Sequence, residues 1–400
     1  MKTEYGMHFY NRPTVLFLTR YFTRFPYVGG PIGERYVGLY NTFIEIFFSE
    51  YNLYWYDEEK MRLYRFVNRR YKAVSNRFLP AILLRLIQNS IRKHHQLLVV
   101  VCYPSACYKL SFLASLVFLL AFKFLNAIKV ILDVVDVPAY VGRETGKWKV
   151  AFLSLHEFLC VKMASRLIVT SETWNEYFFR KKLIHRRQEA FIIPMGSFHR
   201  LIKPTYPPSS KGFTLIYIGP AVRERGIEKL VKCIENVRRK RNDVRLIIAT
   251  AGTPKIPLPK KNWLQVFNNV PTYLHMIELL SRADACVIPY PPGSYWDGTF
   301  IAKLSVYMAS GKPILSTNLP ETKKILQKLG CGLVARDWEE MEDLIIKLCK
   351  DHNLLSFLGR NARAAAEKTY NWETCARALN TLVENVLVGG PEFTQGLARA

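Results

Sequence analysis

Two arginines stand where an apolar run meets a helical segment in residues 217–227, Tyr-Ile-Gly-Pro-Ala-Val-Arg-Glu-Arg-Gly-Ile. The run ends at Gly219, the loop carries Arg223 and Arg225, and a helix is expected to begin near Gly226. The free N–H groups and the dipole of a helix N-terminus attract phosphate, and a guanidinium group can bind two phosphate oxygens at once. The segment is therefore a candidate diphosphate site. The alternative is an ordinary strand-to-helix turn with solvated arginines.

A second candidate lies in residues 289–320, where a loop rich in Gly, Pro and Ser leads into a helical segment. Thr299 and Lys303 occupy its first turns, and Asp297 and Glu321 are the acidic groups that flank the region. A polar loop before a helix again suits phosphate, with the lysine acting as a point charge. Two segments thus carry candidate phosphate-binding residues.

The elements around these segments alternate between short apolar runs and stretches of helix length. Short, fully apolar runs suit the strands of a parallel sheet that is covered on both faces. Alternating strand and helix order then predicts doubly wound α/β domains. The predicted strands are 15–19, 53–56, 97–103, 130–135, 166–170 and 191–194, followed by 214–218, 244–249, 264–267, 285–289 and 313–316. The chain is predicted to close with helices near 338–350, 353–368 and 372–388.

A linker is predicted at residues 203–212, Lys-Pro-Thr-Tyr-Pro-Pro-Ser-Ser-Lys-Gly, because prolines, serines and a glycine concentrate there. The linker separates two α/β domains. The predicted division is an N-terminal domain at 1–202, a C-terminal domain at 213–370, a last helix at 371–390 and a tail at 391–400.

The amino-acid composition restricts the kinds of partner that the chain is expected to bind. With 57 Lys and Arg against 32 Asp and Glu, the net charge of +25 indicates an anionic partner, which is nucleic acid, a nucleotide or an acidic membrane surface. Half of the residues are hydrophobic, which excludes a disordered or low-complexity chain.

The compartment is predicted from cysteine usage and from the lack of targeting signals. The 8 cysteines are scattered without a Cys-x-x-Cys pair, which favours free thiols in a reducing compartment over disulfides or a zinc site. Residues 1–11 lack the apolar core of a signal peptide. The apolar stretch at 110–122 is too short to span a bilayer. We therefore expect an intracellular protein without a transmembrane segment.

Cations are concentrated in residues 60–132, which contain many Lys and Arg and no Asp or Glu. Short charge runs are usually solvated helix faces, but this segment is long and also carries aromatic and aliphatic residues. It predicts a contact with an anionic membrane surface, so that the protein would lie peripherally on the cytoplasmic face. The stretch at 110–122 has two readings, a helix buried against the sheet and a membrane-facing helix.

Several motifs together resemble the retaining glycosyltransferases of the GT-B fold in the large family-4 group, whose C-terminal half is the glycosyl transferases group 1 domain. The strongest is KLSVYMASGKPILS at 303–316 with Glu321 after it, which resembles "KLxEYMAxGKPVV…E". Weaker likenesses occur in the same order as in the family. They are 215–226 to "YxG…KG", 279–289 to "xLSxADxxxxP", 370–373 to "YSWE", 133–136 to "YDxxD", 163–172 to "ADxVIVxS" and 193–196 to "IPNG".

The resemblance implies two Rossmann-like doubly wound domains that face each other across a cleft, with a C-terminal helix that crosses back to the N-terminal domain. It places the donor nucleotide in the C-terminal domain. Arg225 stands where the family has a lysine that contacts the diphosphate. The family's arginine directly after the strand glycine, Gly219, is replaced by Pro220, so that Arg223 is the candidate substitute.

In the N-terminal domain, the resemblance assigns Gly29 and Gly30 to a glycine loop whose backbone N–H groups approach the phosphates. It also places Asp136 opposite the reacting sugar and the acceptor.

One departure from the family pattern concerns its two glutamates, which fall at Gly298 and Val306 in this chain. The second of them usually holds the ribose hydroxyls of the nucleotide, and a valine accepts no hydrogen bond. Asp297 and Ser305 are the candidates to compensate. The departure leaves open an active transferase, an altered choice of donor and a loss of catalysis.

The predicted function is transfer of a hexosyl group from a nucleotide-diphosphate sugar to a glycan or lipid-linked acceptor, with retention, and without a cofactor or metal. Arg223, Arg225 and Lys303 would stabilise the charge that develops on the leaving diphosphate. The donor-binding set is completed by Gly298 and Thr299. A non-catalytic nucleotide-sugar-binding protein is the first rival. A basic nucleic-acid-binding protein is the second and weaker rival: it would explain the charge of +25, but no RNP-like, Cys2His2 or basic heptad signature is present, so nucleic acid is not the expected partner.

Overall fold

The computed structural model describes residues 12–19, 35–57, 59–77, 79–92, 96–103, 128–137, 147–184, 190–204, 212–270 and 272–388. Gly29, Gly30, the stretch at 110–122 and most of the linker predicted at 203–212 lie outside these residues. The chain divides into two compact units. We call Met1–Arg24, Gly29–Pro194 and Cys375–Ala400 the N-terminal unit, and Phe25–Val28 and Met195–Thr374 the C-terminal unit.

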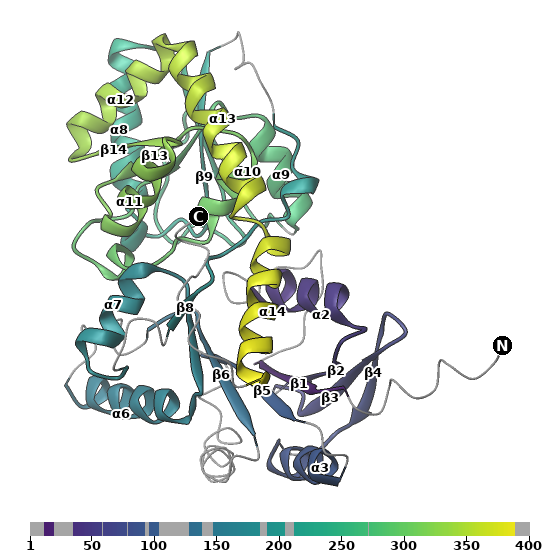
Figure 1. The fold of residues 1–400 in the computed structure, drawn as a ribbon. Coiled ribbons are helices and arrows are strands. Elements are labelled where there is room, and N and C mark those ends of the chain that lie inside the picture. Colours follow the sequence, from purple (N-terminus) through teal and green to yellow (C-terminus); the bar gives the residue numbers. More distant parts are fainter. Residues whose placement is uncertain are drawn as a thin grey trace, which may run out of the picture. The chain divides into compact units, whose positions relative to one another are not determined.

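The N-terminal unit is built on a sheet in the order β4-β3-β2-β1-β5-β6-β7-β8 (Figure 1). Its strands are β1 (Thr14–Thr19), β2 (Asn52–Asp57), β3 (Arg62–Val67), β4 (Arg70–Ser75), β5 (Leu97–Tyr103), β6 (Lys129–Val134), β7 (Arg166–Val169) and β8 (Ala190–Ile192). Its helices are η1 (Tyr36–Tyr40), α2 (Asn41–Phe47), α3 (Leu79–Arg92), α6 (Lys147–Met163), α7 (Glu172–Arg180) and α14 (Trp372–Val388), of which the last begins in the C-terminal unit. The strands β2-β1-β5-β6-β7-β8 pair in parallel. Strands β1 and β5 are buried along their whole length, as the apolar runs predict.

An antiparallel hairpin at the sheet edge differs from the sequence expectation. Residues 60–95 show mainly as a basic run in sequence, but β3 pairs antiparallel with both β2 and β4. The turn between β3 and β4 uses Asn68 and Arg69, both with positive φ (50° and 58°), which matches the right-handed twist of a two-residue hairpin. The frequent charges of this segment hid the alternation of apolar and polar residues that marks an edge strand.

The C-terminal unit is built on a fully parallel sheet in the order β11-β10-β9-β12-β13-β14. Its strands are β9 (Phe213–Ile218), β10 (Val244–Ala249), β11 (Leu264–Phe267), β12 (Ala285–Ile288), β13 (Ile314–Thr317) and β14 (Gly332–Ala335), the last of which the sequence analysis did not predict. Its helices are η4 (His199–Leu201), η5 (Arg223–Arg225), α8 (Ile227–Lys240), α9 (Tyr273–Ser281), η6 (Tyr295–Asp297), α10 (Lys303–Ala309), α11 (Pro320–Leu329), α12 (Trp338–Lys350) and α13 (His352–Lys368). The two doubly wound α/β units confirm the predicted fold class.

The boundary between the units follows Pro194, before the linker predicted at 203–212. Residues 195–202 belong to the C-terminal unit because hydrogen bonds hold them there. The Ser305 hydroxyl donates to the Gly196 carbonyl (2.8 Å), and the Ser197 hydroxyl donates to the Tyr370 carbonyl (3.0 Å). Composition marks where a chain can be flexible, but only these tertiary contacts decide which unit a short loop joins.

The last helix, α14, returns to the N-terminal unit from Cys375 onward. There the Tyr51 hydroxyl donates to the side-chain oxygen of Asn380 (2.9 Å), and the two residues lie far apart in sequence. The crossing helix that the resemblance implied is therefore present.

The described cysteines are free thiols and are buried. None of the helices in the described part of the chain combines the length and the apolar character that a bilayer crossing needs.

Candidate functional site

The turn after β9 places two glycines where no side chain fits. Gly219 has a φ of 134° and Gly226 a φ of 72°, a region that favours glycine. A Cβ atom on Gly226 would lie 2.0 Å from the carbonyl oxygen of Pro289, which follows β12. The chain can therefore turn closely over the end of the neighbouring strand, and η5 carries Arg223 and Arg225 over the carboxyl end of the sheet.

Arg225 and Lys303 meet beside Gly219. A Cβ atom built on Gly219 would lie 2.9 Å from Lys303 Nζ and 3.0 Å from Arg225 Nη1. Two cationic groups from segments nearly eighty residues apart in sequence thus lie beside the same glycine at the end of β9. The fold brings together the two phosphate-binding segments that the sequence analysis selected separately.

Three aromatic side chains line this pair of cations. Lys303 Nζ lies 4.0 Å from the ring centre of Tyr217 and 4.8 Å from that of Tyr290. The Arg225 guanidinium lies 5.4 Å from the ring centre of Tyr290 and 5.1 Å from that of Trp296, and it donates to the Tyr290 hydroxyl at 3.1 Å. The electron-rich faces of the rings stabilise the cations without neutralising them.

The Lys303 ammonium lacks a hydrogen-bonding partner in the described part of the chain. Its nitrogen is also buried. Burial lowers the pKa of Lys303 well below its ordinary value, and the positive charge of Arg225 lowers it further. An ammonium group removed from water needs a counter-charge, so this site is suited to bind an anion that contacts both cations.

Other predicted donor-binding residues have partners within their own loops. The exposed Arg223 side chain pairs with Glu228 of α8, with Nε 3.1 Å from Oε2. The Asp297 carboxylate accepts the backbone N–H of Gly293 (3.0 and 3.2 Å), and burial raises the pKa of Asp297. The Thr299 hydroxyl donates to the carbonyl of Tyr295 (3.2 Å).

The two positions that hold glutamates in the family, Gly298 and Val306, are buried in this chain. Val306 is 2 % exposed on α10, and the Ser305 hydroxyl lies 2.8 Å from the Gly196 carbonyl and 2.9 Å from that of Ala302. Ser305 thus has local partners in this structure. Glu321 is buried in the first turn of α11, which packs against η6.

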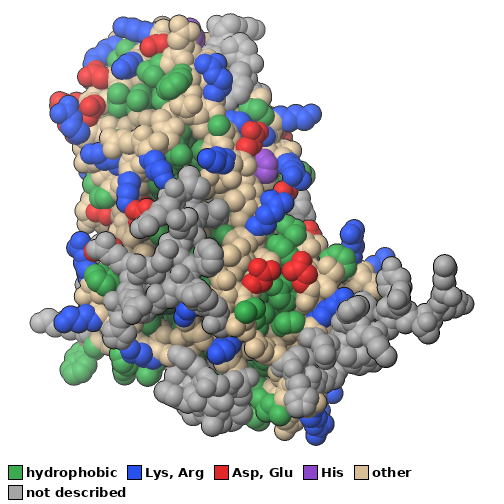
Figure 2. Space-filling model, in the orientation of Figure 1, with side chains coloured by type: hydrophobic (Ala, Val, Ile, Leu, Met, Phe, Trp, Pro, Cys, Tyr) green, Lys and Arg blue, Asp and Glu red, His purple; other side chains and the backbone are tan. Residues whose placement is uncertain are grey.

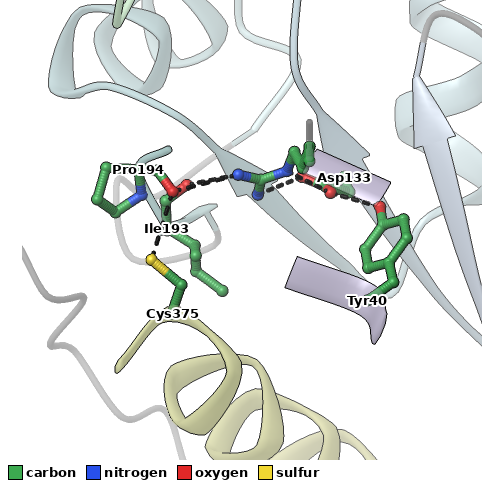
Figure 3. A network of polar contacts seen from close by, with 6 residues as sticks. Tyr40, Asp133, Ile193, Pro194 and Cys375 are labelled. Carbon is green, nitrogen blue, oxygen red and sulfur yellow. Dashed lines mark hydrogen bonds and ion pairs between the residues drawn. The ribbon is translucent and has the colours of Figure 1, made fainter. Parts of the chain in front are cut away.

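In the N-terminal unit, Asp136 follows the end of β6 and is half-buried. Below it, Asp133 of β6 is fully buried and forms a bidentate ion pair with Arg35, with both N–O distances at 2.7 Å. The Tyr40 hydroxyl donates to the same carboxylate (Figure 3). Arg35 also donates to the carbonyls of Ile193 and Pro194, at 3.1 and 3.3 Å.

This buried network supports the carboxyl edge of the N-terminal sheet. It links β6 to the chain after β8, and the Cys375 thiol at the start of the returning part of α14 contacts the Pro194 carbonyl (3.6 Å). In the sequence, Asp133 stands out only as part of the motif at 133–136, and neither Arg35 nor Tyr40 was predicted as a site residue.

The aromatic residues around the cations were also missed as site residues. Tyr217, Tyr290 and Trp296 occur within the two candidate segments, and the signal that marks Tyr217 and Tyr290 is an aromatic residue at or just after the end of a strand, whereas Trp296 has no such signal. In the described ranges, no group of three or more His, Cys, Asp or Glu side chains has a metal-binding arrangement.

Residues 212–351 match the model of the family described as glycosyl transferases group 1. No curated protein sequence matches the chain. The match covers most of the C-terminal unit and includes Gly219, Arg225 and Lys303.

Solved structures resemble the whole chain. A sucrose-phosphate synthase from Thermosynechococcus elongatus has a TM-score of 0.65 at 14% identity, covering 95% of this chain and 100% of that one. A glycosyltransferase from Rickettsia africae has a TM-score of 0.62 at 12% identity, with coverages of 95% and 100%. The Anabaena protein HepE in complex with UDP-glucose has a TM-score of 0.60 at 13% identity, with coverages of 93% and 99%. The chain therefore has the fold of the GT-B glycosyltransferases, and its C-terminal unit carries the group 1 glycosyl transferase pattern.

Proposed function

We propose that the protein is a glycosyltransferase that moves a hexosyl group from a nucleotide-diphosphate sugar to a glycan or lipid-linked acceptor. The observation that carries this proposal is the buried Lys303 ammonium, which has no hydrogen-bond partner among the described residues and lies beside Arg225 at Gly219. A diphosphate bound there would supply the missing counter-charge. The similar fold of HepE, solved with UDP and with UDP-glucose, supports a nucleotide sugar as the donor.

In the proposed reaction the sugar–phosphate bond breaks through an oxocarbenium-like transition state, and negative charge accumulates on the leaving diphosphate. Preorganised cations that interact most strongly with the leaving group lower this barrier. Arg225 and Lys303 take that role, with no metal required, and Asp136 is assigned to the side of the sugar and acceptor. Retention of the anomeric configuration is proposed from the motif resemblance alone.

The direct experiment is a transfer and hydrolysis assay with a panel of UDP- and GDP-sugars. Turnover of one donor, with a product that keeps the anomeric configuration, supports the proposal. Saturable nucleotide binding without turnover would instead favour a non-catalytic nucleotide-sugar-binding protein. Gly298 and Val306 in place of the family glutamates favour that second function.

Val306 provides a test of the ribose contact. We expect Val306→Glu to tighten the binding of the preferred nucleoside diphosphate by about tenfold, because a hydrogen bond to a charged group contributes roughly 1.5–3 kcal/mol. Isothermal titration calorimetry measures the affinity, and Val306→Leu is the apolar control. Val306→Gln covers the case in which a buried carboxylate prevents folding. Weaker binding by variants whose melting temperatures are unchanged would show that the pocket uses Val306 as an apolar contact.

We also propose that residues 60–132 contact an anionic membrane on its cytoplasmic face. The β3–β4 hairpin exposes Arg62, Arg65, Arg69 and Arg70 at the sheet edge. Each Lys or Arg close to an anionic leaflet contributes on the order of 1 kcal/mol. A membrane location suits a lipid-linked acceptor.

Changing these four arginines to serine is expected to lower binding to anionic vesicles by roughly tenfold or more. The measurement is co-sedimentation of the full chain with vesicles of phosphatidylcholine alone or mixed with phosphatidylglycerol. The matched control removes four exposed cations of the C-terminal unit by changing Lys232, Arg239, Lys240 and Lys260 to serine. Equal losses in the two variants, or equal binding to both kinds of vesicle, would contradict the assignment to the hairpin.

A further inference from the structure

Helix α6 presents a row of large apolar side chains to solvent. Trp148 is 91% exposed, Phe152 and Leu155 are each 58% exposed, and Phe158 is 41% exposed. These positions recur every three or four residues and so form one stripe along the helix. A helix that covers a sheet normally buries such a stripe. We call these four residues the α6 stripe.

Other sides of α6 carry buried residues with partners of their own. Glu157 accepts a hydrogen bond from the Tyr177 hydroxyl of α7 (3.0 Å), and the ring of His156 stacks on Tyr103 at the end of β5 (5.8 Å between centres). Both side chains are less than 5 % exposed. Rotating α6 to bury its stripe would break these contacts, so the packing determines the orientation of the stripe.

Helix α3 covers the same face of the N-terminal sheet. Right-handed crossovers from β4 to β5 and from β6 to β7 place α3 and α6 together on one face, and Figure 1 shows both below the sheet while α2 lies above it. Exposed residues of α3 include Ile91, at 60%, and the cations Arg85 and Arg92. Figure 2 shows hydrophobic side chains projecting from the end of the molecule where Figure 1 places α6.

The exposed charged side chains that the structure describes on α3 and α6 are all positive. Among the side chains that the structure describes on these helices, the cations are Arg85, Arg92 and Lys162, all exposed, and the carboxylate is Glu157, which is 2 % exposed. The exposed Lys162 ammonium lies 5.6 Å from the ring centre of Phe158 in the stripe. Aromatic and leucine side chains flanked by lysines match the boundary between acyl chains and anionic headgroups.

We propose that the α6 stripe inserts into the headgroup–acyl boundary of an anionic membrane, with the cations of α3 and α6 on the lipid phosphates. This proposal rests on the membrane contact proposed for the hairpin and adds to it an inserting element outside residues 60–132. An anionic lipid surface is favoured over a protein partner because it satisfies the apolar stripe and the one-sided positive charge together. None of these residues belongs to the nucleotide site, so the proposal does not depend on the donor.

Insertion can be measured through Trp148. The chain contains 7 tryptophans, and the other six are buried or half-buried. The full chain is mixed with phosphatidylcholine–phosphatidylglycerol vesicles whose acyl chains are brominated, which quench tryptophans at the acyl level. We expect quenching for the wild type and its loss in Trp148→Phe, which keeps an apolar ring and still binds. Absence of quenching in vesicle-bound wild type would overturn insertion.

Binding is measured by vesicle flotation at low and high salt. Changing Trp148, Phe152 and Leu155 to serine is expected to lower the partition coefficient by about tenfold or more at high salt, where the remaining binding is mainly apolar. The control variant, Leu274→Ser with Phe357→Ser, removes apolar side chains of similar exposure (53% and 52%) from the C-terminal unit and should bind as the wild type does. Nucleotide affinity and melting temperature should be unchanged in both.

Wild-type flotation by the triple variant would overturn the proposal. A wild-type dimer that the triple variant loses, together with unchanged flotation, would assign the stripe to a protein interface instead. Loss of binding only in the hairpin arginine variant would leave the electrostatic contact standing and would exclude insertion by α6. Nucleotide-sugar turnover in solution reports separately on the proposed function.

Discussion

Replacing Lys303 with methionine is expected to lower donor turnover by about 10²-fold or more, the usual cost of removing one group that stabilises a developing anion. Arg225→Ala should have an effect of the same size. The melting temperature of Lys303→Met should be unchanged or higher, because in the free protein the buried ammonium has no hydrogen-bond partner among the described residues. Lost activity with retained stability is the signature of a group held in place for a ligand.

The control is Lys232→Met, which removes an exposed lysine of α8 in the same unit and should leave turnover unchanged. Near-normal turnover in Lys303→Met and Arg225→Ala would remove both residues from the diphosphate site. Arg223→Ala is expected to have a smaller effect, because Arg223 is exposed and paired with Glu228.

The pH dependence of nucleotide binding follows from the same residue. Burial, and then the charge of Arg225, lowers the pKa of Lys303 in the free protein, whereas a bound diphosphate favours the charged ammonium. Affinity should therefore fall as the pH rises through the lowered pKa of Lys303, and binding in that range should take up protons. Calorimetry in buffers of different ionisation enthalpy measures the uptake, which Lys303→Met should abolish.

Replacing Asp133 with asparagine is expected to destabilise the N-terminal unit by about 3–5 kcal/mol, because it leaves the Arg35 guanidinium buried without a counter-charge. Both side chains of this pair have no exposed surface. Differential scanning calorimetry should show the transition of this unit shifted down by roughly 10 °C.

The matched control is Glu176→Gln, which removes a carboxylate from a pair with Arg180 in the same unit. The Arg180 side chain is 78% exposed, so its charge stays hydrated without the partner and the melting temperature should hardly move. The double variant Arg35→Met with Asp133→Leu should recover part of the stability, because no unpaired charge remains. If Asp133→Asn melts as Glu176→Gln does, the buried pair is not a stabilising element of this unit.

The parallel core could be predicted from the sequence because its signal is local. Runs such as 97–103 and 285–288 are apolar at every position, which only a strand covered on both faces requires. The β3–β4 hairpin could not be predicted in the same way. Its edge strands bury few side chains, and their many charges resemble a solvated helix face.

The residues of the candidate site likewise include some that could be predicted from the sequence and some that could not. Arg225 and Lys303 could be selected because a strand, a turn and a helix N-terminus are readable around each of them. Tyr217 and Tyr290 could not, since a buried tyrosine in an apolar run is ordinary until its ring is found beside a cation. Arg35 also has no local signal, because its partner Asp133 lies 98 positions away in sequence.

Two α/β units with cationic turns at strand ends can be inferred from the amino-acid sequence alone, since periodicity, glycine placement and charge are properties of neighbouring residues. The tertiary structure alone decided that Arg225 and Lys303 meet at Gly219, because parallel pairing of β9 with β12 brings the ends of two distant strands together. It also decided that α6 turns its aromatic side outward. Apolar residues occur on more than one side of that helix, and the partners of Glu157 and His156 determine which side faces the sheet.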